Sequence, residues 1–225
     1  MNREPFRNLL LPLLALWQLA AADARAQTTN ARPFEAEILA FEAVDKTNPP
    51  PRGAILFIGS SSIRKWTRLE QVFRGYKVIN RGFGGSQISD SVYYADRIVI
   101  PYQPQRIVLF AGSNDLDAGK TAEQVFDDFK SFVHKVRGAL PKVEIDYISI
   151  TTSPLRWHEV EQVKKANGLI SSWILTQNRL SFINVFPATL GQDGQPKPEL
   201  YLPDRLHLNA QGYAIWTSII EPYLK

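Results

Sequence analysis

The chain has 225 residues, of which 44% are apolar and 21% are charged, a composition that is ordinary for one globular domain with a sizeable core. It contains no cysteine, which excludes disulfides, thiol nucleophiles and cysteine-ligated zinc. Its 26 basic and 22 acidic residues are interspersed and give a net charge of +4, so we expect no nucleic-acid partner.

The N-terminus has the features of a secretion signal. Two arginines precede an apolar run over residues 9–22, and the small residues Ala24 and Ala26 occupy the positions that a signal peptidase reads. A proline interrupts the apolar run, which is too short to span a bilayer comfortably, so we expect no stable membrane anchor. We predict a signal peptide over residues 1–26, cleavage after Ala26, and an exported protein that is periplasmic or secreted.

A helix is predicted next. Apolar and acidic residues alternate at helical spacing from Phe34 to Val44, and the prolines at 49–51 end this pattern. We therefore assign residues 27–53 to an N-terminal helix with a proline-rich connection, and residues 54–225 to the domain that follows it.

From residue 54 onward, short apolar segments rich in β-branched residues alternate with longer amphipathic segments. The predicted strands cover residues 54–58, 77–79, 106–111, 144–150 and 182–186. The predicted helices cover residues 62–73, 88–99, 121–139, 159–176 and 210–223. Because buried strands that are separated by helices form parallel sheets, we expect a three-layer α/β/α sandwich with a mainly five-stranded parallel sheet. Ligands of such sheets bind at the carboxyl ends of the strands.

A run of serines follows the first predicted strand directly, in the sequence Gly59-Ser60-Ser61-Ser62. Glycine permits a tight turn here, and the helix that begins nearby directs its N-terminal amides to the same place. A hydroxyl in this position can act as a nucleophile, and the same serines are also good caps for the helix. From the residues alone, all three serines are candidates for the nucleophile.

Two further segments supply hydrogen-bond donors at strand ends. Gly82-Phe83-Gly84-Gly85 follows the second strand and lets backbone N–H groups approach an oxyanion or a phosphate, although it lacks the lysine of a Walker loop. Gly112-Ser113-Asn114-Asp115 follows the third strand, and the Asn114 amide is a neutral donor for an oxygen that becomes negative in a transition state. Both segments are equally compatible with ordinary loops.

The 3 histidines of the chain are the candidates for a base near neutral pH. His134 lies within an amphipathic helix, and His158 lies in the turn before a long helix. His207 follows Asp204 in the loop before the last predicted helix, a spacing that can place the carboxylate against one imidazole nitrogen. The other nitrogen is then free to accept a serine proton, so we predict His207 as the base and Asp204 as the residue that orients it.

The order of these four segments resembles the SGNH, or GDSL-like, hydrolase superfamily. The most specific match is Asp204-Arg205-Leu206-His207-Leu208-Asn209-Ala210-Gln211-Gly212-Tyr213, which is similar to the closing block of that family. The resemblance extends from Ala54 to Tyr223 and implies that residues 54–225 form an SGNH-like hydrolase domain. It implies a flavodoxin-like fold and an activity found among esterases, lipases, thioesterases, lysophospholipases and carbohydrate deacetylases.

Alignment with the family motifs implies a role for individual residues. Ser61 takes the place of the nucleophile, Gly85 that of the oxyanion glycine and Asn114 that of the oxyanion asparagine. The resemblance also implies that the N–H of Ser61 is a third oxyanion donor. Ser60 stands where the family usually has aspartate, but that aspartate is not the acid of the triad, so Asp204 is unaffected.

These observations together predict a carboxylic ester hydrolase that forms an acyl-enzyme on Ser61 and needs no cofactor. Export and the lack of a long apolar lid favour a small-molecule or glycan ester as the substrate. The enzyme would then be a carbohydrate deacetylase or a lysophospholipase. A metal-dependent hydrolase is disfavoured, because Asp115, Asp117 and His158 lack the spacing of a metal site. The alternative is a catalytically silent exported carbohydrate-binding protein of the same fold, for which Ser60 is the single argument.

Overall fold

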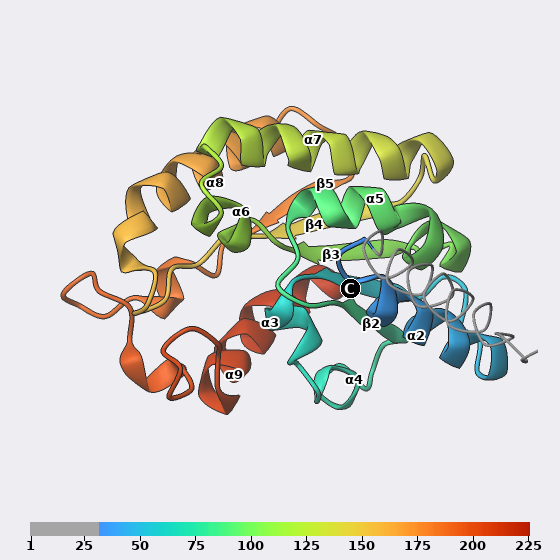
Figure 1. Ribbon diagram of the computed structural model, residues 1–225, viewed down its shortest axis with the longest axis horizontal. Coiled ribbons are helices and arrows are strands. Elements are labelled where there is room, and N and C mark those ends of the chain that lie inside the picture. The colour runs from blue at the N-terminus through green and yellow to red at the C-terminus, as the bar shows by residue number, and fades with distance from the viewer. Residues whose placement is uncertain (1–31) are drawn as a thin grey trace, which may run out of the picture. The chain divides into compact units, whose positions relative to one another are not determined.

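Five parallel strands form the centre of the fold, and helices cover both faces of the sheet (Figure 1). The structure is a computed structural model that describes residues 32–225, so the signal peptide predicted for residues 1–26 lies outside the described residues. Residues 36–225 make up one compact unit. The strands are β1 (Ile55–Gly59), β2 (Val78–Gly82), β3 (Arg106–Phe110), β4 (Glu144–Ile148) and β5 (Leu180–Ile183).

The strand order is β2-β1-β3-β4-β5, which is the flavodoxin-like order that the family resemblance implies. Helices α5, α7 and α8 cover one face of the sheet, and α3, α4 and α9 cover the other (Figure 1). The three-layer α/β/α sandwich predicted from the sequence is therefore confirmed. The helices are α2 (Glu35–Thr47), α3 (Ser61–Arg64), α4 (Leu69–Val72), α5 (Ile88–Ile98), α6 (Ser113–Asp117), α7 (Ala122–Ala139), α8 (Val160–Ile174) and α9 (Ala210–Ile220).

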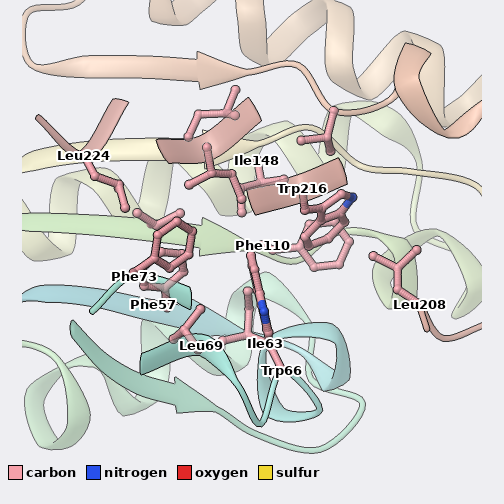
Figure 2. Packing of buried hydrophobic residues seen from close by; sticks show 14 of the residues in the cluster. Phe57, Ile63, Trp66, Leu69, Phe73, Phe110, Ile148, Leu208, Trp216 and Leu224 are labelled. Atoms are coloured by element: carbon pink, nitrogen blue, oxygen red, sulfur yellow. The ribbon is translucent and has the colours of Figure 1, made fainter. Parts of the chain in front are cut away.

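Aromatic side chains fill the core on the face that α3, α4 and α9 cover. Phe57 of β1 stacks on Phe73 with ring centroids 5.4 Å apart, and Trp66 packs edge-on against Phe57 at 6.0 Å (Figure 2). Phe110 of β3 meets Trp216 of α9 at 4.7 Å. Because successive strand residues point to opposite faces, the alternate residues of β1 are buried under the helices of the other face.

The prediction of a single helix over residues 62–73 is wrong. The chain forms α3 and α4 instead, and Trp66 lies between them with 2% of its surface exposed. The interruption lets the indole turn into the aromatic core, where it also packs edge-on against Trp216 at 6.1 Å (Figure 2). Burial of this large side chain outweighs the few helical hydrogen bonds that the break removes.

β2 is longer than the strand predicted over residues 77–79, because it continues through Arg81 to Gly82. A charged residue in a buried strand needs a partner. Arg81 donates to Asp45 of α2 at 2.5 Å and to the hydroxyl of Tyr102 at 3.1 Å. The partner Asp45 lies far away in the sequence, so the local pattern around β2 gives no sign of it.

The other predicted elements are present, with ends that differ by a few residues. The last helix ends at Ile220 rather than at residue 223, and a 3-10 turn follows over Glu221–Leu224. Pro222 lies in this turn and has no N–H with which to continue an α-helix.

None of the helices over residues 32–225 is long and apolar enough to cross a membrane. The boundary predicted between residues 53 and 54 stays a prediction.

Candidate active site

The turn after β1 places Ser61 at the carboxyl edge of the sheet. Gly59 ends the strand with φ of 138°, and a Cβ at this position would lie 1.8 Å from the carbonyl oxygen of Phe110. Only glycine fits here, because both the backbone angle and the contact exclude a side chain. Ser60 is 4% exposed, and its N–H donates to the same carbonyl at 3.0 Å, so α3 begins with Ser61.

Ser61, His207 and Asp204 form a continuous series of hydrogen bonds. The hydroxyl oxygen of Ser61 lies 3.0 Å from Nε2 of His207, and Nδ1 of His207 lies 2.7 Å from Oδ2 of Asp204. A carboxylate can only accept, so Nδ1 carries the proton and Nε2 is free to accept from the serine. Of the serines at 60–62, Ser61 is the one whose hydroxyl meets the imidazole in the described part of the chain.

The Asp204 carboxylate is held ionised by its own loop. Its Oδ1 accepts from the N–H groups of Leu206 and His207, both at 3.0 Å. Partial desolvation raises the pKa of Asp204, but the hydrogen bonds from His207 and Leu206 outweigh it and lower this pKa to about 2. The carboxylate therefore stays charged and oriented toward the imidazole over the whole neutral range.

The ends of this loop are tied together by backbone and cap contacts. The N–H of Leu202 donates to the carbonyl of His207 at 2.8 Å. Asn209 caps α9 by accepting from the N–H of Gln211 at 2.9 Å, and its amide donates to the carbonyl of Glu199 at 2.7 Å. The histidine thus lies in a loop with two fixed ends.

The other two predicted site residues, Gly85 and Asn114, lie side by side. A Cβ on Gly85 would come within 3.9 Å of Nδ2 of Asn114, and this amide nitrogen donates to the carbonyl of Ser86 at 3.0 Å. Within residues 32–225, the N–H groups of Gly85 and Ser61 have no hydrogen-bond acceptor. These free donors and the second hydrogen of the Asn114 amide are the groups that the sequence predicts for an oxyanion hole.

Two charged residues that sequence reasoning missed support the segments around the site, Glu37 at the glycine-rich loop and Lys120 at the segment after β3. Glu37 of α2 accepts from the N–H of Gly84 at 3.2 Å and forms an ion pair with Arg64 at 2.9 Å. Lys120 forms ion pairs with Asp115 at 3.0 Å and with Asp128 at 2.6 Å. The sequence offers no local signal for the contact of Glu37, because Gly84 lies 47 residues away in the chain.

Asp115 connects the loop after β3 to the start of α5. Its carboxylate is fully buried and accepts from the N–H of Ile88 at 3.2 Å. Burial raises the pKa of Asp115, and the Lys120 ammonium opposes that shift. Asp115 follows Asn114 directly, so this network fixes the segment that carries the asparagine.

The residues tested as metal ligands in the sequence are separated in the structure. Asp115 pairs with Lys120, and Asp117 pairs with Arg156 at 2.7 Å. The side chain of His158 is 74% exposed. In the described part of the chain, no three histidine or acidic side chains gather as a metal site.

A small polar cavity of about 30 Å³ lies beside Ser61 and His207. Its walls include Ser113, Thr151, Ser153, Arg156 and Leu206. A larger apolar groove of about 460 Å³ lies elsewhere, where α4 and α9 contribute Val72 and Tyr213 to its walls. Neither Ser61 nor His207 lines this groove, whereas both line the small polar cavity.

Sequence comparison identifies the family of the chain. The model of the GDSL-like lipase/acylhydrolase family matches residues 45–215, so the chain belongs to this family. The class of protein that fold and site define is thus a hydrolase of the GDSL or SGNH esterase type. No curated protein matches the chain by sequence similarity.

Solved structures show the same fold at low sequence identity. A Streptococcus pneumonia protein whose name refers to platelet activating factor is 21% identical, with a TM-score of 0.75 over 95% of this chain and 100% of its own. A GDSL-like lipase from Bacteroides thetaiotaomicron is 20% identical, with a TM-score of 0.70 over 84% of this chain and 97% of its own. A family 3 carbohydrate esterase from Talaromyces cellulolyticus is 17% identical, with a TM-score of 0.61 over 76% and 95%.

Proposed function

We propose that the chain is a serine esterase that removes small acyl groups from ester substrates through an acyl-enzyme on Ser61. The observation that carries this proposal is the hydrogen-bonded series from Asp204 through His207 to Ser61, with distances of 2.7 Å and 3.0 Å. A serine hydroxyl is a weak nucleophile until a neighbouring base can take its proton. The family of the chain supports the class of reaction.

In the proposed first step, Nε2 of His207 accepts the proton of Ser61 as the serine oxygen attacks the ester carbonyl. The negative Asp204 carboxylate stabilises the imidazolium that forms. The tetrahedral intermediate then collapses, the bond to the alcohol breaks, and His207 returns the proton to the leaving oxygen. The acyl group remains on Ser61 as an ester.

In the second step, a water molecule attacks the acyl-enzyme while His207 accepts one of its protons. Collapse of the second intermediate releases the carboxylic acid and restores the Ser61 hydroxyl. In both steps the carbonyl oxygen becomes negative, and the N–H groups of Ser61 and Gly85 together with the Asn114 amide are the proposed donors to it. No step needs a cofactor.

The proposed acyl group is acetyl, carried by a glycan or another small alcohol. A cavity of about 30 Å³ beside Ser61 accepts a group about the size of a water molecule or a methyl group. Its serine, threonine and arginine walls do not favour a long alkyl chain, which argues against a lysophospholipid. Carbohydrate esterases are also among the solved structures that share the fold.

A panel of p-nitrophenyl esters from acetate to palmitate, run beside acetylated xylan and a lysophospholipid, tests this proposal. We expect the highest kcat/KM for acetate and a steady decline with chain length. Ser61→Ala should abolish turnover and labelling by a fluorophosphonate probe, whereas the matched variant Ser62→Ala should keep most of both. An adduct that survives Ser61→Ala would refute the assignment of the nucleophile.

The same labelling separates the esterase from a catalytically silent carbohydrate-binding protein. A silent protein would bind an acetylated oligosaccharide without forming an adduct with the probe.

We also propose that the protein is exported after cleavage behind Ala26. N-terminal sequencing of the mature protein should then begin at Gln27, and a mature N-terminus at Met1 would contradict export by this route.

A further inference from the structure

Arg156 lines the small polar cavity and contacts the proposed oxyanion residue directly. Its Nη1 donates to Oδ1 of Asn114 at 2.9 Å and to the hydroxyl of Ser113 at 3.0 Å. Its Nη2 donates to Oδ2 of Asp117 at 2.7 Å. The side chain is 12% exposed, so the guanidinium is held among these partners rather than extended into solvent.

The Asn114 amide has a hydrogen-bond partner on each side, and these two contacts determine which way the amide faces. A guanidinium can only donate, so the group of Asn114 that meets Arg156 must be its oxygen. The carbonyl of Ser86 can only accept, so the group that meets it, at 3.0 Å, must be the nitrogen. The amide is therefore fixed with Nδ2 toward Gly85, and its second hydrogen is left for the substrate oxygen.

We propose that Arg156 is a positioning residue of the oxyanion hole, which acts on the reaction through Asn114. The inference rests on the proposed esterase function and adds the residue that orients and polarises one of its donors. A charge-assisted hydrogen bond to Oδ1 draws electron density from the amide and strengthens its remaining N–H as a donor. This gain is largest when the substrate oxygen is negative, in the transition state.

The loop that carries Arg156 is itself fixed from two sides. The N–H of Arg156 donates to the carbonyl of Ser153 at 3.0 Å. The N–H of Leu155 donates to the carbonyl of Arg205 at 3.1 Å, and Arg205 lies between Asp204 and His207. The arginine therefore extends from a segment that also contacts the loop that carries Asp204 and His207.

The kinetic test measures the hydrolysis of p-nitrophenyl acetate by the Arg156→Met variant. A lost charge-assisted hydrogen bond that matters in the transition state should lower kcat about tenfold to a hundredfold with little change in KM. Arg179→Met is the matched control, since Arg179 pairs with Glu144 at the opposite end of the strands and should leave kcat unchanged.

A double-mutant cycle distinguishes positioning from direct action on the substrate. If Arg156 acts through the amide, its replacement should lower kcat less than about twofold in an Asn114→Ala background. An undiminished loss in that background would overturn the inference. Ser61→Ala distinguishes this failure from failure of the proposed esterase function. If Ser61→Ala abolishes hydrolysis but the effects of the Arg156 and Asn114 variants are additive, only the role of Arg156 is refuted.

Chemical rescue adds a readout that a folding defect would not give. Guanidinium ion added to Arg156→Ala should restore part of the lost kcat in a saturable manner, whereas it should not restore Asn114→Ala. Arg156→Lys should recover less than guanidinium does, because an ammonium cannot reproduce the planar fork that meets Asn114 and Asp117 together. No rescue of Arg156→Ala at any guanidinium concentration below the unfolding range would contradict the proposal.

Discussion

The two halves of the candidate active site are built in different ways. The base side is local: Asp204 and His207 lie in one short loop, and the carboxylate accepts hydrogen bonds from the N–H groups of its own segment. The oxyanion side is assembled from distant parts, because Gly85 and Asn114 follow different strands and depend on side chains such as Arg156. The spacing that builds the base side is visible in the sequence, whereas a side chain that supports the oxyanion side, such as Arg156, becomes visible only in the fold.

Replacement of Asp204 by asparagine should lower kcat more than replacement of Asn114 by alanine does, because it disables the local half of the site. An asparagine amide favours the wrong imidazole tautomer, which typically costs about 10⁴ in kcat. The measurement is kcat for p-nitrophenyl acetate. Asp96→Asn is the matched control, since Asp96 forms an exposed ion pair with Lys135. A loss of less than about tenfold would remove Asp204 from the orienting role.

Asn114→Ala disables the assembled half and should have a smaller effect. Loss of one oxyanion donor typically costs about 2.7 to 4 kcal/mol of barrier, or about 10² to 10³ in kcat. KM should change little, because the donor acts mainly on the negative oxygen of the transition state. Steady-state kinetics across the ester panel measure both constants. An Asn114→Ala enzyme with unchanged kcat would show that the amide does not contact the oxyanion.

The proximity of the proposed site residues is predictable from the sequence, because three of them follow strands of one parallel sheet. The carboxyl ends of such strands meet at a common edge, so Ser61, Gly85 and Asn114 come together once the strands are recognised. The closing loop adds Asp204 and His207 through a spacing that is itself sufficient for their contact. The resemblance to a family then distinguishes Ser61 from its two neighbours.

The supports of these groups could not be predicted in the same way. Arg156 contacts Asn114 across a separation of 42 residues, and Glu37 contacts Gly84 across 47. Each is one ordinary charged residue in a chain with 26 basic and 22 acidic ones, and nothing in its neighbourhood marks its partner. The break at Trp66 and the extension of β2 through Arg81 have the same origin, because tertiary packing decided both.

Lys120→Met should show that the segment behind Asn114 depends on a buried ion pair. The Asp115 carboxylate is fully buried, and Lys120 is its ion-pair partner at 3.0 Å. Removal of one partner of a buried pair typically costs about 3 kcal/mol of the free energy of unfolding. Urea unfolding measures this loss. Lys135→Met breaks an exposed pair and should cost less than about 1 kcal/mol, and an equal effect of both variants would contradict the distinction.

The smallest predicted effect concerns the acid stability of the local half. The pKa of Asp204 is about 2 in the folded protein, below the ordinary value of 3.8, because hydrogen bonds from His207 and Leu206 outweigh partial desolvation. A lowered folded-state pKa means that the ionised carboxylate stabilises the fold above pH 3.8, and that this contribution disappears as the pH falls to about 2.

The urea midpoints of the wild type and of Asp204→Asn, measured from pH 6 down to the onset of acid unfolding, test this sign. The wild type should be the more stable at pH 6, and the difference should shrink steadily below pH 4, because the neutral carboxyl then resembles the amide. Asp204 is 44% exposed, so solvent screening keeps the difference small. A difference that grows on acidification would mean that the loop stabilises the neutral acid, and that its N–H groups do not hold the charge.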